Sequence, residues 1–314
     1  MQQTQLSLDA THRGMRFVVL FGLLLVVALV IGACQPVSPA APVAEQATPA
    51  ATEEPVEAGD PANGEYIANL TGGCGCHFNS DLGGLAGGRK FEGPFGVVYS
   101  ANLTSDEETG IAGLSDEVLI SILRTGQEVE EDGEIEVMHP IMPYMTFSVM
   151  SDKDVRDLVA YLRTLPPLSN AVPERELASD PQPFTPAAAP PAESPTEPVV
   201  RGEYLVTLAN CGGCHTPRNE DGSPNTDMLL AGGPIPDEIA ANITPDEATG
   251  IGRWSEEEIA NLLITGIKPN GDETAGAMAQ QVRRRFSRLT EEDALAIAAY
   301  LKSIPAVSND PYSN

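Results

Sequence analysis

Two cysteines separated by two residues and followed at once by a histidine, Cys211-Gly-Gly-Cys214-His215, are the feature that most constrains this chain. This spacing is the attachment pattern of c-type haem: each thiol adds to one porphyrin vinyl group, and the histidine lies beneath the ring where its imidazole can bind iron. A disulfide, a zinc half-site and a thioredoxin-like dithiol are the alternatives. Zinc would need a second ligand pair, and no Cys or His follows His215. A redox dithiol has no use for the histidine. The motif therefore predicts a covalently bound haem.

The chain carries an internal repeat. Short motifs recur in the same order and at a nearly constant offset: Gly-Glu-Tyr at 64–66 and 202–204, Cys-His at 76–77 and 214–215, and Ala-Asn-Leu-Thr at 101–104 as Ala-Asn-Ile-Thr at 241–244. An offset this constant over a whole domain indicates a duplication.

Composition delimits the two copies. Segments 35–61 and 171–197 are rich in Pro and Ala without a period, which is typical of a tether and a linker. We therefore expect domains at 62–170 and 198–314. The whole chain has 27 Pro, 29 Gly and only 5% aromatic residues. This composition suits small domains that each close over a large apolar cofactor.

Both copies are predicted to be helical. Serine or threonine followed by acidic residues, a typical helix start, occurs at Ser115, Ser151, Ser255 and Thr290. No sustained strand alternation is present. We therefore expect an all-α fold in which a few helices of each domain wrap around a haem.

The N-terminus predicts export. Arg13 and Arg16 precede an apolar run at 17–31 that ends in Ile-Gly-Ala-Cys34, so residues 1–34 read as a signal whose end resembles the bacterial lipobox. Cys34 is then a lipidated anchor on the outer face of the cytoplasmic membrane. An uncleaved signal anchor is the alternative, and it leaves the domains on the same side.

The charge is strongly acidic. Lys+Arg 18 against Asp+Glu 45 gives a formal net charge of -27. This argues against a nucleic-acid partner and is consistent with a basic protein partner or simply with solubility. The basic run at 283–285 is either a docking patch or a set of local ion pairs.

In the second copy, Cys-x-x-Cys-His is followed by Asn-Ile-Thr-Pro-Asp at 242–246, Thr-Gly-Ile-Gly at 249–252 and a Trp-Ser-Glu helix start at 254–256. This order resembles class I cytochrome c, and more narrowly the tandem dihaem cytochrome c subunits that accompany periplasmic alcohol and sugar dehydrogenases. The resemblance covers 62–168 and 198–308. It implies two haem c groups, each with histidine and methionine on opposite faces, and electron transfer between redox protein partners without catalysis by the chain itself.

The resemblance also implies which methionines bind iron. Met278, in Gly-Ala-Met-Ala, resembles the family's methionine loop, and Met142, in Met-Pro-Tyr, follows His77 at nearly the same separation as Met278 follows His215. Met228 lies much closer to His215, in the loop just after the attachment motif, and is the alternative in the second copy. His139 would instead make the first site bis-histidine.

The first copy departs from the attachment pattern, because only Gly75 separates Cys74 from Cys76. When the two Cys-His pairs are aligned, Cys76 and His77 match Cys214 and His215, whereas Cys74 matches Gly212. Three interpretations remain: one thioether at Cys76, a strained pair of thioethers, or a domain without haem. The register predicts a single thioether through Cys76 and leaves Cys74 undecided.

These motifs favour a lipid-anchored dihaem electron carrier. A dihaem peroxidase is an alternative of another class, and it needs one iron with an open or displaceable position. A monohaem carrier with a structural first domain is a third. Methionine candidates in both copies favour the carrier.

Overall fold

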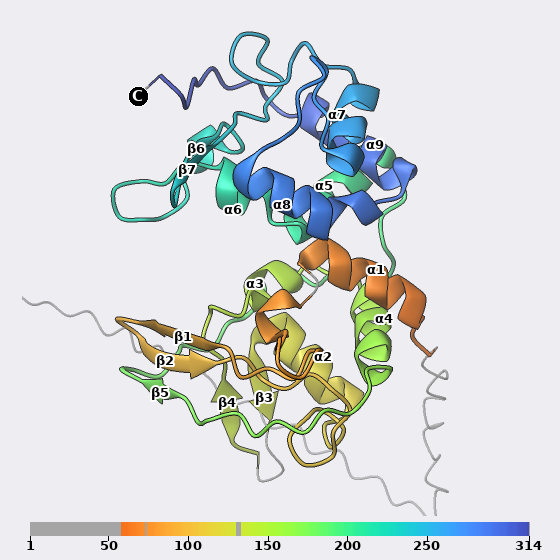
Figure 1. Cartoon of the computed structure of the whole chain (residues 1–314), viewed down its shortest axis with the longest axis vertical. Coiled ribbons are helices and arrows are strands. Elements are labelled where there is room, and N and C mark those ends of the chain that lie inside the picture. Colours follow the sequence, from red (N-terminus) through yellow and green to blue (C-terminus); the bar gives the residue numbers. More distant parts are fainter. Residues whose placement is uncertain (1–57, 73, 130–132, 314) are drawn as a thin grey trace, which may run out of the picture. The chain divides into compact units, whose positions relative to one another are not determined.

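Two copies of one helical unit follow each other along the chain (Figure 1). The computed structural model describes residues 58–72, 74–129 and 133–313, which belong to one compact unit, Pro55–Asn314. The predicted export signal, Cys34 and most of the predicted tether lie outside the described residues. No helix within the described ranges is long and apolar enough to span a membrane.

The helices of the two copies correspond in order. The first copy contains α1 (Pro61–Thr71), the 3-10 turn η1 (Gly75–His77), α2 (Asp116–Thr125), α3 (Tyr144–Phe147) and α4 (Asp152–Arg163). The second contains α5 (Pro198–Leu208), α6 (Cys211–His215), η2 (Thr226–Met228), α7 (Glu256–Thr265), α8 (Gly276–Arg284), η3 (Phe286–Arg288) and α9 (Glu291–Ser303).

The predicted helix starts are confirmed by their caps. The Ser115 side chain accepts the backbone N–H of Val118 at the start of α2. At the start of α7, Ser255 and Glu258 form a reciprocal capping box. These side chains satisfy backbone N–H groups that have no partner within the helix.

The first and last helices of each copy cross at a glycine. A Cβ added to Gly64 would lie 1.9 Å from the Asp157 carbonyl oxygen, and one added to Gly202 would lie 1.9 Å from that of Ala296. Only glycine permits this approach, so α1 packs on α4 in the same way as α5 packs on α9.

The expectation of an all-α fold is wrong. Antiparallel strands form a sheet in the order β1 (Lys90–Gly93), β2 (Gly96–Tyr99) and β5 (Glu176–Leu177), and two hairpins, β3 (Gln127–Val129) with β4 (Ile135–Val137) and β6 (Gly233–Ile235) with β7 (Glu238–Ala240). Each strand has two to four residues, too few to show the two-residue alternation by which strands are recognised.

The segment predicted as a linker, 171–197, follows the first copy. Its strand β5 pairs with β2, the Gln127 side chain donates to the Phe184 carbonyl at 2.9 Å, and the Asp152 backbone N–H donates to the Pro191 carbonyl at 2.9 Å. The Pro-rich stretch is thus fixed to the first copy by hydrogen bonds.

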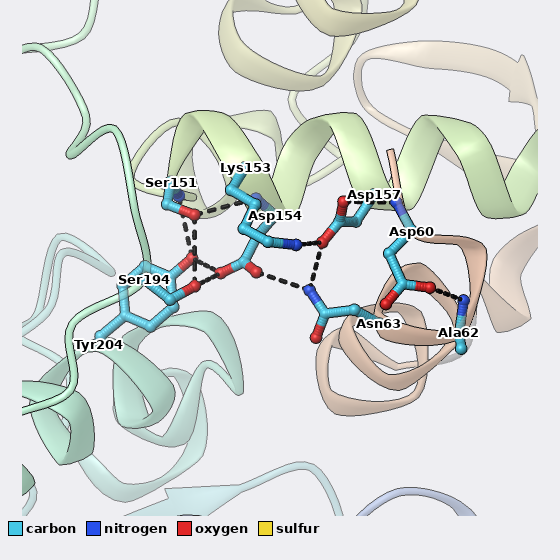
Figure 2. Close-up of polar contacts among 9 residues, drawn as sticks. All are labelled: Asp60, Ala62, Asn63, Ser151, Lys153, Asp154, Asp157, Ser194 and Tyr204. Carbon is cyan, nitrogen blue, oxygen red and sulfur yellow. Dashed lines mark hydrogen bonds and ion pairs between the residues drawn. The ribbon is translucent and has the colours of Figure 1, made fainter. Parts of the chain in front are cut away.

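A buried aspartate of the first copy binds a tyrosine of the second (Figure 2). The Tyr204 hydroxyl on α5 donates to Asp154 Oδ2 on α4 at 2.6 Å and accepts the Ser151 backbone N–H at 2.9 Å. Asp154 also accepts from Asn63 Nδ2, at 2.9 Å, and from Ser194. The carboxylate is therefore satisfied by neutral donors from α1, α5 and the segment between the copies.

The same bond recurs with the copies exchanged. The Tyr66 hydroxyl on α1 donates to Asp293 Oδ2 on α9 at 2.5 Å, and the Arg201 guanidinium donates to both oxygens of Asp293 at 2.8 Å. Tyr66 matches Tyr204 in the repeat, and Asp293 matches Asp154. The two tyrosine–aspartate hydrogen bonds thus join matched residues with the copies exchanged, as across the interface of a symmetric dimer.

Candidate haem-binding site

The second attachment motif begins directly after α5. Ala209 caps α5, Asn210 takes the left-handed conformation at φ 55°, and α6 carries Cys211, Cys214 and His215. The left-handed backbone at Asn210 changes the direction of the chain after α5, and a new helical turn begins at Cys211. The two thiols and the imidazole are therefore presented by a single short turn.

A backbone carbonyl orients His215. Its Nδ1 lies 2.7 Å from the Ala241 carbonyl oxygen, and because a carbonyl can only accept, Nδ1 carries the proton. Nε2 then keeps its lone pair, which is the tautomer that binds metal. Burial lowers the pKa of His215, although the Ala241 hydrogen bond opposes the change. The imidazole is therefore neutral near neutral pH.

His77 is held in the same way. Its Nδ1 lies 2.7 Å from the Ala101 carbonyl oxygen, and burial lowers its pKa although this hydrogen bond opposes the change. Ala101 and Ala241 are matched positions of the repeat. Both copies thus contain a neutral imidazole with a free Nε2, whatever the spacing of their cysteines.

A buried asparagine follows each of the two alanines. Asn102 donates to the Leu168 carbonyl at 2.7 Å, and Asn242 donates to the Val307 carbonyl at 2.8 Å. Each asparagine also accepts from the threonine two residues later. The role of the preceding alanine carbonyls was not predicted from the sequence. The repeated Ala-Asn-x-Thr motif was the available signal.

Thiols next to His215 are free to react. Cys211 and Cys214 are not joined in a disulfide. Cys214 is exposed, whereas Cys211 is partly buried against the hydrophobic core. Burial raises the pKa of Cys211 to about 11, although the nearby Arg285 opposes the rise. Cys211 is thus an uncharged thiol near neutral pH.

Cys74 lies in surroundings like those of Cys211 despite its shifted register. It too is partly buried against the core, and burial raises its pKa to about 11. Burial raises the pKa values of the matched Tyr161 on α4 and Tyr300 on α9. Glu65 and then Cys74 add to the rise at Tyr161, and Glu203 and then Cys211 add to it at Tyr300. Cys74 and Cys211 are thus similar in burial and in the direction of their pKa shift.

The backbone of the first motif accommodates the missing residue. Cys74 has φ 52°, in the left-handed region that few non-glycine residues adopt. It precedes η1, which carries Cys76 and His77. With this backbone Cys74 is partly buried and Cys76 is exposed, which is the same arrangement as in Cys211 and Cys214.

The methionines chosen as sixth ligands both lie at a helix start. Met142 precedes α3, and Met278 is the third residue of α8, so it lies in a first helical turn rather than in an open loop. Both are partly buried against the same hydrophobic core as Cys74 and Cys211. Their bonds to iron stay predictions.

The other candidate ligands have defined surroundings. Met228 lies in η2 and is half-buried. The His139 ring packs on Phe95 with centroids 4.3 Å apart, and its Nδ1 accepts the Ile141 backbone N–H at 3.2 Å. His139 is thus fixed in the segment between β4 and α3, and its role as a ligand stays the alternative for the first copy.

The residues present fit haem c. Each copy offers a neutral, oriented imidazole, free thiols beside it and a half-buried methionine. Within 58–72, 74–129 and 133–313, no three His, Cys, Asp or Glu residues gather into a group that could hold a metal ion. The donor set fits a covalently attached haem with histidine as one ligand, and methionine as the other ligand stays a prediction.

Fold and site together define a c-type haem protein. A family model described as cytochrome c matches residues 199–305. A diheme cytochrome c-type protein of Cereibacter sphaeroides is 36% identical over 270 residues, which cover 79% of this chain and 87% of that protein. The chain belongs to the cytochrome c family.

Subunits of larger enzymes are also similar. The fructose dehydrogenase cytochrome subunit of Gluconobacter japonicus is 35% identical over 277 residues, covering 82% of this chain and 54% of that subunit. The cytochrome c subunit of the quinone alcohol dehydrogenase of Gluconobacter oxydans is 35% identical over 265 residues, covering 78% and 54%. The chain thus spans about half the length of these two relatives.

Proposed function

We propose that this protein is a dihaem c-type cytochrome that carries electrons between redox protein partners outside the cytoplasmic membrane. The observation that carries this proposal is the duplicated histidine contact, His77 to Ala101 and His215 to Ala241, at 2.7 Å in both copies. A structural first domain would have no need of a buried neutral imidazole with a free Nε2.

In this proposal each copy holds one haem. Cys211, Cys214, His215 and Met278 hold the second. Cys76, His77 and Met142 hold the first. A haem supplies a one-electron iron couple, and methionine ligation raises its potential relative to bis-histidine. The chain fixes the tautomer of each imidazole and keeps the ring neutral.

Cys74 completes the first attachment site in this proposal. Its thiol is partly buried against the hydrophobic core and uncharged, like that of Cys211. Addition of the S–H bond across a vinyl group forms a C–S bond and places the hydrogen on the neighbouring carbon, so no oxidant is needed. This differs from the single thioether predicted from the register, because the register does not account for the left-handed backbone at Cys74.

Dehydrogenases are the proposed partners. The relatives include proteins named as cytochrome subunits of fructose, alcohol and gluconate dehydrogenases. By analogy, this chain would accept electrons from a catalytic subunit and pass them to a further acceptor. Its net charge of -27 suits a partner with a basic docking face.

Ligand binding separates the carrier from a peroxidase. With methionine on both irons, the reduced protein is low-spin, and carbon monoxide or hydrogen peroxide changes neither haem rapidly. A high-spin haem that binds carbon monoxide and turns over peroxide would contradict the carrier and support a peroxidase. The measurement is the visible spectrum of the purified protein before and after each addition.

Cys34 is the proposed membrane anchor. The Cys34→Ser variant should lose acylation and be released from the membrane fraction, while its haem spectrum stays that of the wild type. Unchanged membrane retention, with no acyl group on Cys34 in the wild-type protein, would contradict lipidation and support the signal anchor.

A further inference from the structure

The basic run at 283–285 does not act as a unit. Arg283 and Arg284 are the last residues of α8 and their side chains are exposed. Arg285 follows the helix with φ -129° and ψ -67°, and its side chain is partly buried. The end of α8 thus turns one of three consecutive cations inward.

Arg285 binds backbone carbonyls of both copies. Its Nε donates to the Leu70 carbonyl at 3.0 Å, and its Nη2 donates to the Leu70 and Ala209 carbonyls, the latter at 2.8 Å. Nη1 donates to Gln281 Oε1 at 3.0 Å. Among the described residues, no ion pair joins Arg285 to a carboxylate. Its charge is thus offset by dipoles rather than by a counterion.

Those carbonyls lie at the C-terminal ends of the two helices that precede the attachment cysteines. Leu70 lies in the last turn of α1, shortly before Cys74, and Ala209 caps α5, shortly before Cys211. The last carbonyls of a helix have no partner within it and carry negative partial charge. One guanidinium therefore joins the C-terminal ends of α1 and α5.

The guanidinium also lies close to the second attachment motif. Its Nη2 donates to the Ala209 carbonyl at 2.8 Å, and Ala209 stands two residues before Cys211. In a partly buried setting a fixed cation acts more strongly than in water, because solvent screens it less. Such a charge stabilises the reduced state of a neighbouring iron, which has one positive charge fewer.

We propose that Arg285 is a positioning residue that joins the two haem-attachment segments and whose charge raises the reduction potential of the second-domain haem. This rests on the proposed function, since it assumes a haem at Cys211, Cys214 and His215 and a second one in the first domain.

The test compares Arg285→Gln with Arg284→Gln in the full-length protein matured with haem. Both variants remove one positive charge near the end of α8, but Arg284 is exposed. Potentials are measured by spectroelectrochemical titration, and the second haem is the one whose wave is displaced by Met278→Ala. We expect Arg285→Gln to lower the potential of that haem clearly more than Arg284→Gln does. Equal shifts in the two variants would overturn the role of the charge.

A second variant tests the bridge itself. Arg285→Lys keeps the charge but loses the forked contact with two carbonyls. We expect the second-domain haem of Arg285→Lys to have a reduction potential close to that in Arg284→Gln. We also expect amide hydrogen exchange in Arg285→Lys to be severalfold faster than in the wild type at both 71–76 and 210–213. Unchanged exchange at either segment would overturn the bridge. This test uses Arg285→Lys alone, so it does not depend on whether Arg285→Gln folds.

Intact mass decides the haem number separately. A wild type with one haem would refute the dihaem proposal, while the effect of Arg285 on the second-domain haem would remain measurable.

Discussion

Tyr204 of the second copy donates a 2.6 Å hydrogen bond to Asp154 of the first, and the repeat-matched Tyr66 and Asp293 make the reciprocal bond at 2.5 Å. Each tyrosine lies on the helix that leads to an attachment motif, and each aspartate lies in the first turn of the last helix of the other copy. The two copies therefore contact each other through matched residues. These contacts hold α1 and α5, the helices that lead to the two attachment motifs.

The Tyr204 hydrogen bond should contribute measurably to stability. Tyr204→Phe removes a donor to the buried Asp154 carboxylate and an acceptor of the Ser151 N–H, so we expect the free energy of unfolding to fall by about 1–3 kcal/mol. Tyr66→Phe should cost less, because Arg201 still pairs with Asp293. Guanidinium unfolding followed by circular dichroism measures both. Tyr312→Phe is the control because that side chain is 63% exposed. A loss for Tyr204→Phe no larger than for the control would contradict the contact.

These tyrosines also predict a pH dependence. Burial, reinforced by the facing aspartate, raises the pKa of Tyr66 and that of Tyr204. In the unfolded chain a phenol loses its proton near about pH 10, so above that pH the unfolded state binds fewer protons than the folded state. Their contribution is thus present below about pH 10 and is lost as the pH rises. The stability difference between about pH 8 and about pH 11 should shrink in the Tyr66→Phe, Tyr204→Phe double variant; an unchanged difference would count against the raised pKa values.

Met278 should be the sixth ligand of the second haem. Met278→Ala should remove the long-wavelength charge-transfer band of that ferric haem and lower its potential, because a thioether ligand favours the reduced state. Met228→Ala, a change of the same size in η2, is the control and should leave the band intact. Loss of the band in Met228→Ala alone would show that the assignment is wrong.

Cys74 should carry a thioether. In the wild type, the pyridine haemochrome of both haems should then lie at the position of two saturated vinyl groups. Cys74→Ser should shift the first-domain haem to longer wavelength, and a peptide containing only Cys76 should retain its haem in mass spectra. Cys211→Ser is the matched change in the second copy. A wild-type spectrum that already shows one free vinyl, unchanged in Cys74→Ser, would support the single thioether instead.

Much of the site could be predicted from the sequence. Motifs such as Cys-x-x-Cys-His and the helix caps at Ser115 and Ser255 are local, so their chemistry is legible in a few residues. The short strands were missed because a segment as short as Gln127–Val129 shows no period. The alanine carbonyls behind His77 and His215 were also missed, since the repeated Ala-Asn-x-Thr motif does not show which group each carbonyl binds. The inward turn of Arg285 was missed because burial depends on the fold.

Intact mass spectrometry of the purified full-length protein, matured in a host that attaches haem c, distinguishes two bound haems from one. We expect a mass equal to the processed chain plus two haems, and a His77→Ala variant should weaken ligation of the first haem while leaving the second unchanged. A mass corresponding to one haem, attached to the peptide that contains Cys211 and Cys214, would contradict the dihaem cytochrome and leave the first copy as a structural domain.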